Sequence, residues 1–152
     1  TNNRLGPLLQ QFATVSYAES PNLAWWLAYS DLRVPEVAEG FERTKTIILE
    51  AHEQTHNELD NAEFVVVIIP FREQVLYTDA EFQPVLDASN EALFDFCQQH
   101  GILVIDTTAA VKEQIQGEAE PIFFRDSHLN ERGNEVVAEI LAQELNEMLP
   151  QQ

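Results

Sequence analysis

An aspartate and a histidine two positions apart, Asp126 and His128, are the residues of this sequence best suited to acid–base chemistry. In a tight loop, the carboxylate can accept the proton on one imidazole nitrogen, which leaves the other nitrogen free to take a proton from a nucleophile. The pair follows a short apolar run, residues 121–124, and precedes a helical pattern that Asn130 can cap. The sequence therefore predicts that the pair lies at the carboxyl end of a sheet, where ligands bind in open α/β folds.

Strands are predicted at two continuously apolar runs, residues 64–69 and 102–105. Neither run alternates polar with apolar residues, which is typical of strands covered on both faces, as in a parallel sheet. Residues 121–124 form a third, weaker candidate just before Arg125. The sequence therefore predicts a short parallel sheet.

Helices are predicted between and around these runs, over residues 35–61, 79–99, 107–116 and 131–148, and within the first thirty residues. The expected end signals are Ser20 and Pro21 before the first helix, Pro35 at the start of the second, Asp79 and Gly101 around the third, Thr107 or Thr108 and Gly117 around the fourth, and Asn130 before the last.

This alternation of helix and strand predicts an α/β fold with three layers, α/β/α, around the parallel sheet. The 152 residues suffice for a single domain, in which residues 1–34 are a helical segment and residues 35–149 the α/β part. So few strands leave a sheet edge that further strands, the N-terminal helices or a second copy of the chain could cover. Because the first residue is Thr1 rather than Met, we expect a fragment or a processed product, and an incomplete domain.

A resemblance to a known family rests mainly on residues 126–133. Their sequence, Asp126-Ser127-His128-Leu129-Asn130 and then Gly133 in an apolar helix, resembles the terminal catalytic block of the SGNH (GDSL-type) esterases and acyltransferases. The strand at residues 65–70 and the loop Arg72-Glu73-Gln74-Val75 are similar to segments that many of these proteins carry before that block.

The resemblance covers residues 35–149 and implies a flavodoxin-like α/β/α domain that hydrolyses an ester or transfers an acyl group. It implies that His128 is the general base and that Asp126 is its orienting partner. Arg72, which follows the first strand, and Asn130, within the block, are the residues that we expect to bind substrate.

Two features differ from the family pattern. The commoner family spacing is Asp-x-x-His, and this chain has one residue fewer, as some family members and polysaccharide O-acetyltransferases do. The family's nucleophile lies in a Gly-Asp-Ser triplet, which is absent from this sequence, since Ser30-Asp31 has the reverse order. We therefore expect that the nucleophilic serine lies outside this chain and that the chain alone is inactive.

Two other interpretations stay open. A degenerate relative of the family could be a noncatalytic α/β module that binds a carbohydrate or a protein, with Asp126 capping a turn and His128 exposed. Residues 52–56, His-Glu-Gln-Thr-His, also fit the H-E-x-x-H pattern of zinc peptidases. At about 100° per residue, however, Glu53 of that pattern points to solvent, away from the apolar stripe of its helix. We therefore expect a solvated helix flank and no metal site there.

Charge excludes several other classes of partner. The chain has 26 Asp and Glu against 8 Lys and Arg, a formal net charge of −18, which disfavours binding to nucleic acids and to anionic membrane surfaces. The expected partners are a small-molecule or carbohydrate ester and, through an exposed sheet edge, a second copy of the chain.

Other classes are excluded by cysteine content and by hydropathy. The single cysteine, Cys97, excludes an internal disulfide and a cysteine-based zinc site, and no cofactor is expected. No apolar run reaches the roughly 18 residues of a membrane span. The family resemblance favours the cell envelope or another extracytoplasmic location, and the residues themselves leave the compartment open.

Overall fold

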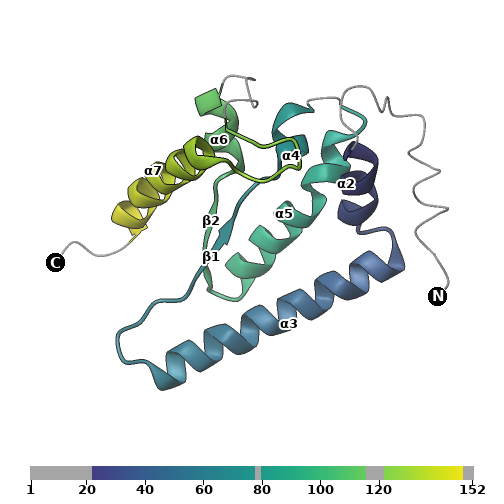
Figure 1. Ribbon diagram of the computed structural model, residues 1–152. Helices are drawn as coiled ribbons and strands as arrows, with labels where there is room; N and C mark the ends of the chain where they lie inside the picture. Colours follow the sequence, from purple (N-terminus) through teal and green to yellow (C-terminus); the bar gives the residue numbers. More distant parts are fainter. Residues whose placement is uncertain (1–21, 78–79, 116–121, 149–152) are drawn as a thin grey trace.

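The computed structural model describes residues 22–77, 80–115 and 122–148 of the chain. Figure 1 shows its helices and strands in order of sequence. They are α2 (Leu23–Ser30), α3 (Pro35–Glu58), β1 (Val65–Ile68), α4 (Arg72–Leu76), α5 (Gln83–Gln99), β2 (Leu103–Asp106), α6 (Thr108–Ile115) and α7 (Glu131–Met148). Among these helices, none has both the length and the apolar character needed to cross a membrane.

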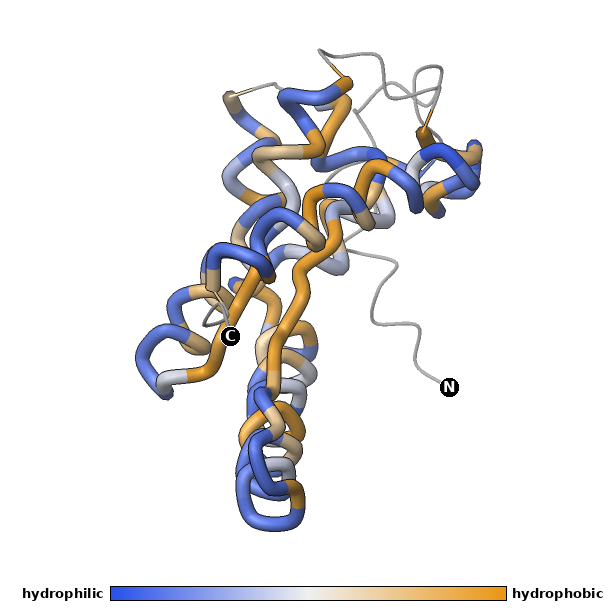
Figure 2. The backbone as a smooth tube through the Cα atoms, turned by 90° about the vertical axis from the view of Figure 1, so that its left-hand side faces the viewer, coloured by the Kyte–Doolittle hydropathy of each residue, from blue (hydrophilic) through white to orange (hydrophobic). Residues whose placement is uncertain are grey.

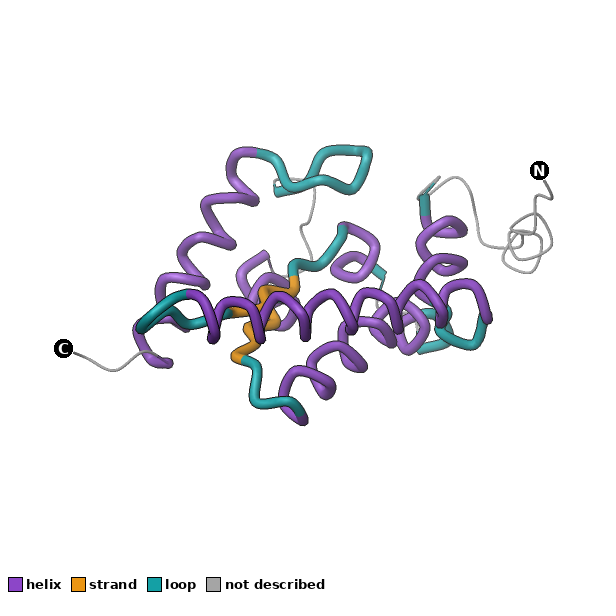
Figure 3. Tube along the Cα trace, turned by 90° about the horizontal axis from the view of Figure 1, so that it is seen from below, coloured by secondary structure: helices purple, strands orange, loops and turns teal. Residues whose placement is uncertain are grey.

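The sheet of the described residues consists of β1 and β2, which pair in parallel with Val65 opposite Leu103 and Ile68 opposite Asp106. Both strands are apolar along most of their length (Figure 2). They lie between α7 and α5 in the views of Figures 1 and 3, so helices flank the sheet on both sides, as the predicted α/β/α layering requires. Val67, inside β1, and Ile69, just after its end, are nevertheless exposed.

Hydrogen bonds to the last residue of each strand mark where the two strands end. The backbone N–H and the hydroxyl of Thr107 both donate to the carbonyl oxygen of Ile68, at 3.0 Å each. The carboxylate of Asp106 accepts the backbone N–H of Thr108 at 2.9 Å. Thr107 directly precedes α6 and accepts the backbone N–H of Val111 at 2.9 Å, so the predicted N-cap position is confirmed. Its hydroxyl, however, ties the two strands together, and the Asp106 carboxylate accepts the first N–H of the helix.

Most predicted helices are present close to their expected limits. Pro35 begins α3, the positive φ of Gly101 (67°) follows α5, and Asn130 accepts the backbone N–H of Gly133 at 2.9 Å as the cap of α7. The expected signals at Ser20, Pro21, Asp79 and Gly117 lie outside the described residues.

Two local predictions are wrong. Residues 72–76, expected as a loop, form the short helix α4, in which the Gln74 side chain accepts the backbone N–H of Phe71 at 3.1 Å. The expected third strand is absent from residues 122–124, because Phe123 pairs instead with Leu129 in an isolated antiparallel bridge. This segment therefore folds back on its own loop rather than joining the sheet.

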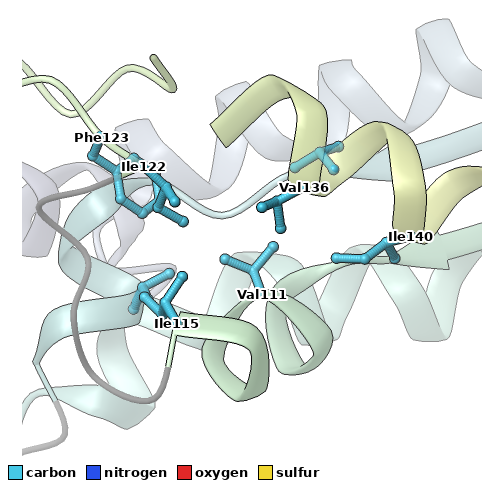
Figure 4. Close-up of a cluster of buried hydrophobic side chains, with 8 residues drawn as sticks. Val111, Ile115, Ile122, Phe123, Val136 and Ile140 are labelled. Carbon is cyan, nitrogen blue, oxygen red and sulfur yellow. The ribbon is translucent and has the colours of Figure 1, made fainter. Parts of the chain in front are cut away.

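The buried residues form two clusters. One joins α4, α6, residues 122–123 and α7 and is shown in Figure 4; it consists of Val75, Val111, Ile115, Ile122, Phe123, Val136, Val137 and Ile140. The other packs α2 against α5 and consists of Leu23, Ala24, Leu27, Ala28 and Leu86. The first cluster anchors the start of the loop that carries Asp126 and His128, through Ile122 and Phe123. The second cluster positions α2 beside that loop.

Gly133 lets α7 approach the strand-like segment before the loop. A Cβ atom on Gly133 would lie 2.2 Å from the carbonyl oxygen of Ile122 and 2.9 Å from Cδ2 of Leu129. The backbone oxygen of Ile122 also accepts the N–H of Asn130 at 3.0 Å, so it cannot move without breaking that bond. Only glycine fits this contact.

We expect Gly133→Ala to lower the free energy of unfolding by about 1–3 kcal/mol or more, because the added methyl group overpacks against backbone. The matched control is Gly40→Ala in α3, where a Cβ atom would meet nothing within 4 Å and alanine should raise stability by about 0.5–1 kcal/mol. Urea unfolding of the two variants measures both effects, and equal stabilities would contradict the close approach at Gly133.

Candidate active site

The loop that carries Asp126 and His128 is closed by three backbone hydrogen bonds. Phe124 N–H donates to the carbonyl of His128 at 2.8 Å, Ser127 N–H donates to the carbonyl of Phe124 at 3.2 Å, and Asn130 N–H donates to the carbonyl of Ile122 at 3.0 Å. These bonds fold residues 122–130 into a compact hairpin directly before α7. The predicted strand-loop-helix setting is thus replaced by a hairpin-helix setting.

The side chains of Asp126 and His128 meet at the tip of this loop. Nδ1 of His128 lies 3.3 Å from Oδ1 of Asp126, and the backbone N–H of His128 donates to the same oxygen at 3.3 Å. That backbone hydrogen bond, with a smaller contribution from the imidazole, holds the pKa of Asp126 below its ordinary value. The Asp126 carboxylate is therefore ionised near neutral pH and can orient an imidazole.

Both side chains are open to solvent, with 82% of the His128 side chain and 71% of the Asp126 side chain exposed. The 3.3 Å separation exceeds the roughly 2.7–2.9 Å of a charge-assisted N–H···O bond. Catalytic hydrogen bonds are often long before substrate binds and shorten when the imidazole becomes charged. The arrangement of the two side chains is therefore compatible with an orienting acid and a base, but both remain open to solvent rather than enclosed by protein.

Ser127, between the two, points the other way. Its hydroxyl donates to Oε2 of Glu73 at 2.7 Å and accepts the indole N–H of Trp26 at 3.2 Å. Ser127 and Glu73 are buried, and Ser127 has a φ of 74°, in the left-handed region that non-glycine residues rarely adopt. In this unusual conformation, Ser127 directs its hydroxyl into the interior of the protein. The side chains of Asp126 and His128, on either side of it, meet at the surface.

A cleft of about 390 Å³ lies beside the pair. Its apolar wall comes from the end of β1, from α2 and from the loop, and its polar groups come from the loop and the first turn of α7. The lining residues are Trp26, Ile69, Pro70, Phe71, Asp126, Ser127, His128, Leu129 and Asn134. The carboxyl end of β1 and the predicted catalytic pair therefore share one cleft, as expected for an α/β fold.

The two residues expected to bind substrate lie elsewhere. Arg72 is buried at the start of α4, and Asn130 holds the first turn of α7 through its side-chain oxygen. Neither lines the cleft beside His128. Their role in substrate binding stays a prediction, whereas the capping role predicted for Asn130 is confirmed.

The H-E-x-x-H pattern lies on α3, away from the cleft. The rings of His52 and His56 are 6.2 Å apart, and His52 lies against the ring of Phe64. Glu53 is exposed, as its angle around the helix predicted. In the part of the chain that the structure describes, no group of three His, Cys, Asp or Glu residues is placed to hold a metal ion.

Sequence reasoning missed three residues of the site, Trp26, Glu73 and Ser127. Glu73 was placed only in a loop and Ser127 only within the block of the family resemblance, and Trp26 was given no role. The available signal was the position of Glu73, an acidic residue soon after the proline that ends a strand. A carboxylate at that place is poorly suited to a buried setting unless it has a hydrogen-bond donor.

Comparison with known proteins gave one family. The family model of the SGNH hydrolase-like domain of acetyltransferase AlgX matches residues 24–152. Neither the curated proteins nor the solved structures gave a match. The matched range contains every residue of the cleft, of the loop and of the buried Glu73 contact.

We expect NMR titration of the Asp126 carboxyl carbon to give a midpoint below the ordinary value of about 3.9, with the His128 amide proton shifting in step. Because the pKa is lower in the folded chain, the contact stabilises the fold above the ordinary pKa, and that stabilisation is lost as the pH falls through the folded pKa. The control is the same titration in urea, where Asp126 should return to its ordinary value. A folded midpoint at or above that value would contradict the loop geometry.

Proposed function

Because this chain belongs to the family of the SGNH hydrolase-like domain of acetyltransferase AlgX, we propose that its cleft is the general-base part of an ester-acting, acyl-transferring site. His128 is the proposed base and Asp126 its orienting partner. The observation that carries the proposal is the contact between these two side chains at the rim of a cleft, inside the matched range.

The proposed chemistry follows from the two imidazole nitrogens. Nδ1 faces Asp126, so Nε2 is available to remove a proton from a serine hydroxyl as the serine oxygen attacks the carbonyl carbon of an ester. The imidazolium then gives that proton to the departing alcohol, and the acyl group stays on the serine. Water or a second alcohol, deprotonated in turn by His128, then attacks the acyl group, and the imidazolium returns the proton to the serine oxygen as the acyl–serine bond breaks.

The attacking serine is proposed to come from outside this chain. The sequence has no Gly-Asp-Ser triplet, and the serine that lines the cleft, Ser127, has its hydroxyl committed to Glu73. A nucleophile must instead point into the cleft toward His128. Its approach is open, because the imidazole is largely exposed and the end of β1 borders the same space.

The substrate is proposed to be an uncharged ester of a small molecule or a carbohydrate. The wall of the cleft is mostly apolar, with Trp26 stacked on Phe71 at 4.1 Å between ring centroids. The formal net charge of −18 repels phosphate-rich polymers. Asn134, also in the cleft lining, donates its amide N–H to the carbonyl of Asn130 at 3.0 Å, and its side-chain oxygen is proposed to bind a substrate hydroxyl.

We expect His128→Ala in the full-length protein to lower kcat for hydrolysis of an aryl acetate by about 10⁴-fold or more, because the base is lost. Asp126→Asn should cost less, about 10²-fold, because solvent screens this exposed carboxylate.

The matched control is His56→Ala, which removes an exposed histidine from α3 and should leave kcat within about twofold, as expected for a surface change remote from the cleft. Near-wild-type hydrolysis by His128→Ala would refute the proposed function.

A further inference from the structure

Glu73 is a carboxylate with no exposure to solvent, located in the first turn of α4 and 54 positions before Ser127 in sequence. Burying a carboxylate is costly unless hydrogen bonds compensate it. The 2.7 Å bond from the Ser127 hydroxyl has the length of a strong O–H···O⁻ contact. A buried acid is thus bound to the one residue that separates Asp126 from His128.

The Ser127 hydroxyl acts as both a hydrogen-bond donor and a hydrogen-bond acceptor. A serine hydroxyl has one proton and two lone pairs. Its proton goes to Glu73, and a lone pair accepts the indole N–H of Trp26 at 3.2 Å. A second residue of the α2 region, Asn22, donates its side-chain N–H groups to the carbonyl of Arg125 at 3.2 Å and to the Ser127 hydroxyl at 3.5 Å. The loop is therefore fixed from two elements, α4 and the start of α2.

The backbone conformation of Ser127 couples the contact of its hydroxyl with Glu73 to the relative positions of Asp126 and His128. A serine with a φ of 74° is rarely stable on its own and persists where surrounding contacts hold it. In this conformation the hydroxyl lies inside while the flanking side chains, Asp126 and His128, meet at 3.3 Å outside. If the serine relaxed to a negative φ, the two flanking side chains would turn relative to each other.

We propose that Glu73 is a positioning residue of the acyl-transfer site, acting through the Ser127 hydroxyl to keep the His128 imidazole in contact with Asp126. The inference rests on the proposed function of His128. Glu73 does not line the cleft, so it acts on the reaction only through the loop.

The kinetic test uses the full-length protein and an aryl acetate. Ser127→Ala removes the donor and Glu73→Leu removes the acceptor, and each should lower kcat by about 10²-fold with little change in KM, the scale of loss that a misplacement near 1 Å produces. Glu73→Gln keeps an oxygen that can accept the hydroxyl proton and should recover most of kcat. The double variant Ser127→Ala with Glu73→Leu should lose no more than Ser127→Ala alone, because removal of the hydroxyl already breaks the contact that Glu73→Leu breaks.

A matched control separates this effect from lost stability. Cys97→Ala truncates a fully buried side chain near the far end of α5 and should lower the melting temperature while leaving kcat unchanged. Ser127→Ala or Glu73→Leu with the kcat of Cys97→Ala would overturn the inference, and so would a Glu73→Gln variant as impaired as Glu73→Leu.

A second readout needs no catalysis and covers the case in which Glu73→Leu fails to fold. In Ser127→Ala, NMR titration of the 152-residue chain should show the pKa of Asp126 rising toward its ordinary value, because the His128 N–H moves away from Oδ1. A pKa unchanged from wild type would overturn the inference. Loss of the proposed function is distinguishable, since it would appear as full activity in His128→Ala while this titration still reported on the loop.

Discussion

The hydrogen bond between the Ser127 hydroxyl and the buried carboxylate of Glu73 is the contact on which the candidate site depends. It ties the loop before α7 to the short helix after β1, two segments that are far apart in sequence. Without it, Ser127 would keep its positive φ only through its backbone bond to Phe124 and the donors of Trp26 and Asn22 that reach its hydroxyl. The exposed pair, Asp126 and His128, therefore takes its geometry from a buried interaction that neither of them makes.

The sequence was sufficient to predict both strands, most helices and the Asp126–His128 contact, because these follow from local patterns. Apolar β-branched runs form buried strands, and an aspartate two positions before a histidine in a tight turn lies within reach of it. It was insufficient for the third strand, since Phe123 pairs with Leu129 only once the loop has closed. The Glu73–Ser127 bond could not be predicted either, because it depends on how α4 packs against the loop in the folded chain.

The site combines a rigid frame with an open face. Gly133 allows α7 to pack onto the carbonyl of Ile122, and the buried cluster of α6 and α7 supports the loop from the interior (Figure 4). The imidazole above this frame is largely exposed, and the end of β1 leaves Ile69 exposed beside it. Such an arrangement suits the proposed base and its proposed orienting acid, and leaves room for the nucleophile and acyl group that the proposed reaction needs.

The central claim, that His128 is the base of a serine-dependent acyl-transfer site, is tested most directly by a structure of the full-length protein after reaction with a serine-directed phosphonate. The expected result is one modified serine whose Oγ lies within about 3.2 Å of His128 Nε2, with the phosphonate group in the cleft beside Phe71 and Leu129. A modified serine remote from His128, or a protein that the reagent leaves unmodified, would contradict it.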